Sequence, residues 1–354
     1  MENYTIGCDA HKHYSQITVM DSHARICKRT RIEHTPGADQ RYLVQYPAGT
    51  PVALECVGNW YWIVDEIEAA GCVVQLTNAG RAKAMMGHVN KTDKLDADGL
   101  ALLSYNGTLP TVWIPGGVLR DERELPRTRM AMSKYRTAVK NRIHATLSKH
   151  AICLEEESDV FSVKGLAALR KSLDGLPVET RRCVEEQLAL LSDIQGHIEE
   201  MEKRIREKTQ WTPTLRLLKS LPGVGDILAI VIDREIGCVT RFPAAENLAS
   251  YAGLTPKVKS SGGKTFYGSM RKESNQYLKW GFVEAANVIV RYHHNPNWKN
   301  KHVVRLYERT AQRKGHAIAV GAVARHLAEA TFWVLTKEET YHEPNSKKDL
   351  PKQG

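Results

Sequence analysis

The chain has 354 residues, of which 42% are hydrophobic and 7% aromatic, and this excludes a wholly disordered or fibrous protein while indicating two or three globular domains. The 50 lysines and arginines exceed the 40 aspartates and glutamates, so the formal charge of +10 makes a polyanion the first partner to consider. The 7 cysteines include no CxxC pair, which argues against a disulfide framework and against a structural zinc site.

Membrane insertion is not expected. The most apolar stretch, residues 317–335, is interrupted by Arg325, His326 and Glu329 and so lacks the apolar run of a bilayer span. The N-terminal sequence MENYTIGCD lacks the basic and apolar regions of a signal peptide. These features predict a cytoplasmic protein without a membrane partner.

Residues 1–118 are predicted to form an α/β domain. Three strand-like runs between Tyr4 and Ile32 indicate consecutive antiparallel strands, and PVALEC and CVVQLTN indicate two further buried strands. Helical patterns cover residues 39–46, 60–71 and 92–105. The order β-β-β-α-β-α-β, followed by the last helix, predicts a mixed sheet flanked by helices.

Residues 119–210 are predicted to form a long basic helix and a coiled-coil linker. The first helix covers about residues 119–154 and starts or kinks near Pro126. Between Arg127 and His150 it has basic residues but no acidic ones: Arg127, Arg129, Lys134, Arg136, Lys140, Arg142 and Lys149. Apolar residues then recur every seven positions at Val184, Leu191, Ile198 and Ile205. This heptad helix, over about residues 180–208, pairs with the preceding helix or with another protomer.

Residues 211–337 are predicted to form a compact, mostly helical domain, and the polar residues 338–354 a disordered tail. The segment LPGVG lies between two apolar helical runs and is typical of a helix-hairpin-helix. Gly223 and Gly225 would let backbone N–H groups approach a phosphate at the start of the second helix. The alternative is a purely structural turn between packed helices.

The excess positive charge lies in the second part of the chain. Residues 1–118 hold 10 basic and 12 acidic residues, a net charge of −2, whereas the remaining residues hold 40 and 28, a net charge of +12. This division predicts chemistry in the first domain and nucleic-acid binding in the rest. For the basic helix the alternative is an ordinary solvated face.

Four carboxylates of the first domain are expected to converge. Asp9 and Glu55 stand at strand ends, and Asp93 and Asp96 lie three residues apart on one helix face. Because crowded carboxylates repel one another, this set predicts Mg²⁺, and two ions about 3.5 to 4 Å apart would suit phosphodiester cleavage. Each acid taken singly is better explained by a solvated surface or helix-capping role, and Asp98 is interpreted as a solvated helix residue.

The sequence SSGGKTFYGSMRK places a small hydroxyl beside two glycines, and Lys264, Arg271 and Lys272 nearby would neutralise phosphate charge. Taken alone, a flexible surface loop explains this segment better than an exposed nucleophile does. His11 and His13 beside Asp9 are interpreted as surface histidines, the alternative being a supporting role behind metal ligands.

Several motifs together resemble a family of insertion-sequence transposases, or recombinases, that joins an N-terminal RuvC-like DEDD domain to a C-terminal transposase domain. In the first domain the similar blocks are GCDAHK, ECVGNWYW and KTDKLDADGLA, of which the last is the most specific. In the second part they are LPGVG, YAGLTPKVKSSGGKTFYG and RKGHAIAVGAVAR. The resemblance covers nearly the whole chain.

The resemblance implies an RNase H or RuvC-like fold for residues 1–118 and a DEDD set of Asp9, Glu55, Asp93 and Asp96. It implies that Ser261 is a nucleophile, with Ser260 as the competing choice. It further implies an Mg²⁺ cofactor, donor and target DNA as substrates, a guiding bridge RNA, and a homo-oligomer, dimer or tetramer. The protein would be prokaryotic and associated with the nucleoid when acting.

The sequence therefore predicts a DNA transposase and recombinase that cuts and rejoins DNA through a phosphoserine intermediate. A first alternative is a structure-specific endonuclease of the resolvase kind, which would use the same four acids without Ser261. A second is a non-catalytic nucleic-acid-binding protein that needs only the basic regions.

Overall fold

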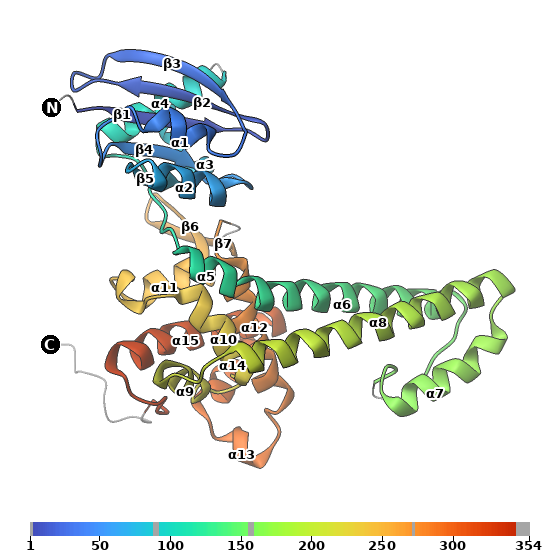
Figure 1. Cartoon of the computed structure of the whole chain (residues 1–354). Helices are drawn as coiled ribbons and strands as arrows, with labels where there is room; N and C mark the ends of the chain where they lie inside the picture. The colour runs from blue at the N-terminus through green and yellow to red at the C-terminus, as the bar shows by residue number, and fades with distance from the viewer. Residues whose placement is uncertain (1–2, 88–91, 155–158, 271–272, 345–354) are drawn as a thin grey trace, which may run out of the picture. The chain divides into compact units, whose positions relative to one another are not determined.

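A computed structural model describes residues 3–87, 92–154, 159–270 and 273–344 (Figure 1). The chain divides into two compact units, residues 1–115 and 116–354. The finer division of the second unit at residues 210 and 337 stays a prediction.

The first unit contains a five-stranded mixed sheet with the strand order β3-β2-β1-β4-β5 (Figure 1). The strands are β1 (Thr5–Ala10), β2 (Tyr14–Met20), β3 (Ile26–Glu33), β4 (Pro51–Glu55) and β5 (Val73–Thr77). Strands β1 to β3 are antiparallel neighbours, whereas β4 runs parallel to β1 and β5 parallel to β4. The predicted α/β class, with three antiparallel strands at its start, is confirmed.

The two faces of this sheet differ in what covers them. Cys8 and Leu54 are paired across β1 and β4 and belong to an apolar core shared with α1 (Ala38–Leu43) and α2 (Trp60–Ala69). On the other face Ala53 packs with Leu100 of α4 (Asp93–Tyr105). A helix that the sequence pattern does not predict, α3 (Ala79–Met86), follows β5.

Helix α4 lies directly on β1 because residue 7 is glycine. A Cβ atom at Gly7 would overlap with the carbonyl oxygen of Ala97 and the amide nitrogen of Ala101. This close approach brings the first turn of α4 to the end of β1, where Asp9 lies on the same face as Gly7.

The second unit begins with an antiparallel pair of long helices (Figure 1). Its first helices are α5 (Gly117–Glu122), α6 (Glu124–Lys149), α7 (Val163–Ser172) and α8 (Val178–Lys208). The heptad residues Val184, Leu191, Ile198 and Ile205 are all buried, and α8 packs along α6 of the same chain. Pro126 lies in the first turn of α6, where its missing N–H costs no helical hydrogen bond.

The remaining elements form a helical core with one hairpin. They are α9 (Pro213–Lys219), α10 (Asp226–Ile236), α11 (Ala245–Tyr251), β6 (Pro256–Ser261), β7 (Lys264–Met270), α12 (Gln276–Arg291), α13 (Pro296–Lys299), α14 (His302–Lys314) and α15 (His316–Lys337), with a 3-10 turn at Val239–Arg241. A second 3-10 turn, Leu173–Gly175, lies between α7 and α8. By length and composition α15 alone among the described helices could cross a membrane. Half of its most apolar segment is, however, buried against neighbouring helices. It is the central helix of this core.

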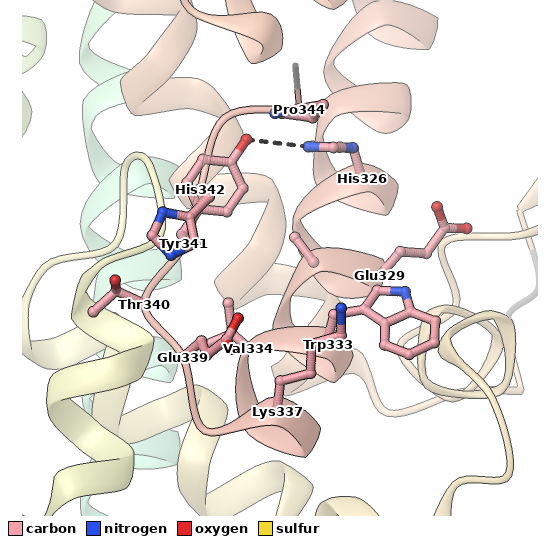
Figure 2. A pocket seen from close by; sticks show the side chains of 11 residues that line it. His326, Glu329, Trp333, Val334, Lys337, Glu339, Thr340, Tyr341, His342 and Pro344 are labelled. Atoms are coloured by element: carbon pink, nitrogen blue, oxygen red, sulfur yellow. Dashed lines mark hydrogen bonds between the residues drawn. The ribbon is translucent and has the colours of Figure 1, made fainter. Parts of the chain in front are cut away.

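Residues 338–344 pack on this core instead of forming part of a disordered tail. The backbone N–H of Tyr341 donates to Ser220 Oγ at 2.7 Å, and Glu343 accepts a hydrogen bond from the backbone N–H of His302 at 2.6 Å. Figure 2 shows the cavity of about 380 Å³ between this segment and α15, with Tyr341 facing His326. The rest of the predicted tail, residues 345–354, lies outside the described residues.

The turn between α9 and α10 favours the structural interpretation for Gly223. Its φ is 77°, and a Cβ atom there would overlap with the carbonyl oxygen of Ala285 in α12. Gly225, by contrast, has open space around it and begins α10. Close packing against α12 therefore accounts for Gly223, and Gly225 alone remains a candidate for phosphate contact.

We predict that Gly223→Ala lowers the free energy of unfolding by about 2 kcal/mol or more, because the added methyl meets backbone that cannot move freely. Gly225→Ala is the matched control and should cost less than about 1 kcal/mol. Denaturant unfolding of both variants measures the difference, and equal effects would contradict the packing explanation.

Candidate active site

Acidic residues of the first unit gather where β1 and β4 end. Because Cys8 pairs with Leu54 in a parallel register, the next residues, Asp9 and Glu55, lie side by side and project from the α4 face. The first turn of α4 supplies Asp93 and Asp96. The Thr92 side chain caps this helix by accepting a hydrogen bond from the backbone N–H of Leu95.

Three of these side chains lie close enough together to hold one ion. Ligand atoms of Asp9, His11 and Asp93 all lie within 4.8 Å of one another. His11 Nε2 is 3.0 Å from Asp9 Oδ2 and 3.4 Å from Asp93 Oδ2. Asp9 itself is 5% exposed. The structure thus brings together Asp9 and Asp93, which are 84 positions apart in the chain, and adds a histidine.

Burial raises the pKa of Asp9, the nearby His11 lowers it, and the charges of Asp96 and Asp93 raise it again. A buried carboxylate with two acidic neighbours needs a compensating positive charge to stay ionised. The donor set fits a hard divalent cation, since it offers carboxylate oxygens at the end of a strand and the start of a helix. Glu55 and Asp96 lie outside the tight group of three, although Asp96 is near enough for its charge to affect Asp9.

The interpretation of His11 as a surface histidine is wrong. Its ring bridges the two aspartates and stacks on Tyr14, with 4.6 Å between ring centroids. The Tyr14 hydroxyl donates to Asp93 Oδ2 at 2.6 Å, and the Arg31 guanidinium lies 3.6 Å from the Tyr14 ring centroid. His13 is exposed, as expected for a surface residue.

Tyr14 is a site residue that the sequence interpretation missed. The strand alternation contained the signal, because β2 pairs with β1 so that Gln16 lies opposite Asp9. Residues two positions apart in a strand share a face, which places Tyr14 on the α4 side with the acids.

Asp98 is also wrongly interpreted as solvated. Its carboxylate accepts two hydrogen bonds from Arg29, at 3.0 and 2.7 Å, and one from the Thr18 hydroxyl at 2.8 Å. Thr18 and Arg29 are paired across β2 and β3. Asp98 therefore ties α4 to the sheet and lies outside the group of residues that could hold a metal.

The segment with Ser261 is an ordered hairpin, not a flexible loop. Strands β6 and β7 are joined by Gly262 and Gly263, a two-residue turn typical of hairpins. Ser261 is exposed at the tip and pairs with Lys264, so both side chains lie on one face. Ser260 lies on the other face, where its hydroxyl is 3.4 Å from that of Thr265. Arg271 and Lys272 lie outside the described residues.

Three arginines of the predicted basic helix make contacts within the second unit. Arg127 donates two hydrogen bonds to the buried Glu235, at 2.7 and 2.9 Å. Arg129 bonds Glu202 and Arg136 bonds Gln195, both on α8. The remaining basic residues of the prediction differ in exposure: Lys134 and Arg142 are exposed, whereas Lys140 lies 4.6 Å from the Phe161 ring centroid.

Two family profiles match this chain. Residues 6–152 match a DEDD-type profile described as a transposase, and residues 215–303 match the transposase IS116/IS110/IS902 family. The chain belongs to the IS110/IS116 family of insertion-sequence transposases. The mixed sheet and its helices form the RuvC-like DEDD domain of that family. Transposases act by cleaving and rejoining DNA.

Relatives agree with this assignment. A probable family 20 transposase of Pseudomonas aeruginosa is 22% identical over 96% of this chain and 98% of its own length. The transposase for insertion sequence element IS1111A of Coxiella burnetii is 23% identical over 95% and 90% of the two chains. An insertion element IS110 protein of Streptomyces coelicolor is 39% identical over 40% of this chain and 34% of its own length.

We predict that Tyr14→Phe weakens divalent metal binding about tenfold, because Asp93 then loses the hydrogen bond that fixes its orientation. Titration calorimetry with Mn²⁺ measures the affinity. Tyr105→Phe is the control, since it removes a hydroxyl that donates only to the Ser22 carbonyl in the same unit. If both variants bind Mn²⁺ alike, Tyr14 does not orient the site.

Proposed function

We propose that this transposase cuts and rejoins DNA through a transient phosphoserine bond formed by Ser261, with Asp9, Glu55, Asp93 and Asp96 binding Mg²⁺. The convergence of Asp9 and Asp93 on His11 is the observation that supports it most. When bound, Mg²⁺ would neutralise phosphate charge and stabilise the attacking and leaving oxygens.

The protein's own residues have separate parts in this proposal. Asp9 is buried and fixed by the sheet, whereas Asp93 is held by the Tyr14 hydroxyl, so little reorganisation is needed when a cation binds. His11 hydrogen-bonds to Asp9, and the same nitrogen lies 3.4 Å from Asp93 Oδ2.

In the covalent step the Ser261 oxygen attacks phosphorus and the bond from phosphorus to the leaving sugar oxygen breaks. The serine proton is lost and the leaving oxygen gains one, so the phosphodiester is exchanged for another diester. Rejoining reverses these bonds without an external energy source. Exposure of Ser261 at a hairpin tip, with Lys264 on the same face, supports access of a DNA phosphate.

Nucleic-acid partners beyond the DNA substrate belong to the same proposal. The net charge of +12 on residues 119–354 supports a polyanionic partner, and exposed Lys134, Arg142, Gly225 and Lys264 are the contacts we favour. The bridge RNA, the dimer or tetramer and the association with the nucleoid rest on the family resemblance.

The metal requirement is tested by Asp9→Asn and Asp93→Asn, which should each reduce strand cleavage by at least about 100-fold, because removing a metal ligand leaves the phosphate charge uncompensated. Wild-type cleavage should stop in EDTA and return with Mg²⁺. Glu68→Gln, an exposed change in the same unit, is the control. Full cleavage in chelator would contradict metal dependence.

The covalent step is tested with a suicide DNA substrate that loses its free end after cleavage. We expect the wild-type protein to form a DNA adduct that survives denaturation, and Ser261→Ala to lose both the adduct and recombination. Ser260→Ala is the control and should keep both. Recombination by Ser261→Ala would instead favour a metal-dependent endonuclease of the resolvase kind.

A further inference from the structure

A polar cavity of about 510 Å³ lies between α6 and α12 in the second unit. Its lining includes Arg129, Ser133, Lys134 and Arg136 from α6 and Trp280 from α12. A volume of this size is in the range of sites for small organic ligands such as a single nucleotide. Three cations line it, and although Glu202 neutralises Arg129, Lys134 and Arg136 still outnumber the one lining carboxylate, that of Glu284, so it favours an anion.

One residue of the lining carries a buried polar group that the fold does not use. Ser133 is 8% exposed, and its hydroxyl has no hydrogen-bond partner within the described part of the chain. A buried hydroxyl without a partner costs about 1–3 kcal/mol, so a small apolar residue would serve packing better. The fold therefore gives no structural reason for a hydroxyl at this position of the lining.

Two arginines of the cavity are held in place by α8. Arg129 Nε and Nη2 both donate to Glu202, at 3.0 and 2.6 Å, and Arg136 Nη1 donates to Gln195 at 2.8 Å. A guanidinium has five N–H donors, so each arginine keeps donors beyond these contacts. Such pre-oriented groups lose little entropy when a phosphate binds.

Trp280 supplies an aromatic surface at the same cavity. Its ring is partly exposed and has the Arg129 guanidinium 5.8 Å from its centroid. An aromatic ring beside cationic groups is the usual means of holding an unstacked base next to its phosphate. An uncharged apolar ligand would satisfy the ring but not Lys134 or the arginines.

We propose that this cavity binds one unstacked nucleotide of a single-stranded nucleic acid, with the base on Trp280 and the phosphate near Lys134 and Arg136. The proposal rests on the proposed function only in taking nucleic acid as the partner. Single-stranded RNA and single-stranded DNA share this chemistry, and separate oligonucleotides of each distinguish them.

The test measures binding of fluorescently labelled 20-nucleotide RNA and DNA strands to the full chain by anisotropy. Trp280→Ala should weaken binding of the preferred strand by about tenfold or more, as expected for the loss of one stacked base. Trp280→Phe should keep most of the affinity. Trp333→Ala, which removes another exposed tryptophan of the same unit, is the matched control and should bind like wild type.

The salt dependence separates stacking from phosphate contact. Lys134→Gln should reduce the slope of log affinity against log salt concentration by about one unit, because one phosphate contact is lost. Trp280→Ala should leave this slope unchanged. Thermal unfolding confirms that each variant is folded. Ser261→Ala should keep wild-type affinity for the strand, so failure of the covalent step and failure of nucleotide binding in the cavity are distinguishable. Wild-type affinity in Trp280→Ala, or no binding of either strand by the wild-type protein, would overturn the proposal.

Discussion

The approach of α4 to β1 at Gly7 is the contact on which the candidate active site depends. Only a residue without a side chain lets the backbone of Ala97 and Ala101 lie against the strand. The first turn of α4 is thereby brought to the strand end, and Asp93 reaches the neighbourhood of Asp9. Any larger residue at position 7 would push the helix and its acids away.

That proximity creates an electrostatic cost which the surrounding residues relieve. Asp9 is buried beside the charges of Asp93 and Asp96, and its pKa is raised accordingly. His11 and Tyr14 hydrogen-bond to the two closest carboxylates, while Asp98 is turned toward Arg29 and kept apart. The same face of the sheet therefore carries acids that are placed to hold a cation and, apart from them, an acid that fastens the helix.

Local periodicity was sufficient to predict much of this fold. Alternation along the strands and the seven-residue spacing of Val184, Leu191, Ile198 and Ile205 reflect burial, which the sequence displays directly. Helix α3 has a weak apolar pattern and was missed. The segment around Gly262 and Gly263 was interpreted as a loop because of its hydroxyls and glycines, whereas the two glycines form the turn of a hairpin.

Side-chain partners were harder to predict than elements. Arg127 lies only three residues after Glu124, yet it is bound to Glu235, which lies 108 residues further along the chain. Asp98 and His11 were misinterpreted for a similar reason, because Asp98 is bound to Arg29 of β3 and His11 contacts Asp93 of α4. A run of basic residues thus overstates the charge that is free to contact nucleic acid, and the tertiary fold decides which side chains remain available.

The central claim is that Asp9 and Asp93 hold a divalent cation. Anomalous diffraction from crystals of the protein equilibrated with Mn²⁺ tests it most directly, because it locates the ion without reference to activity. We expect a peak at coordination distance from carboxylate oxygens of both residues. Mn²⁺-saturated crystals with no peak between these carboxylates, and His11 still bridging them, would contradict the account.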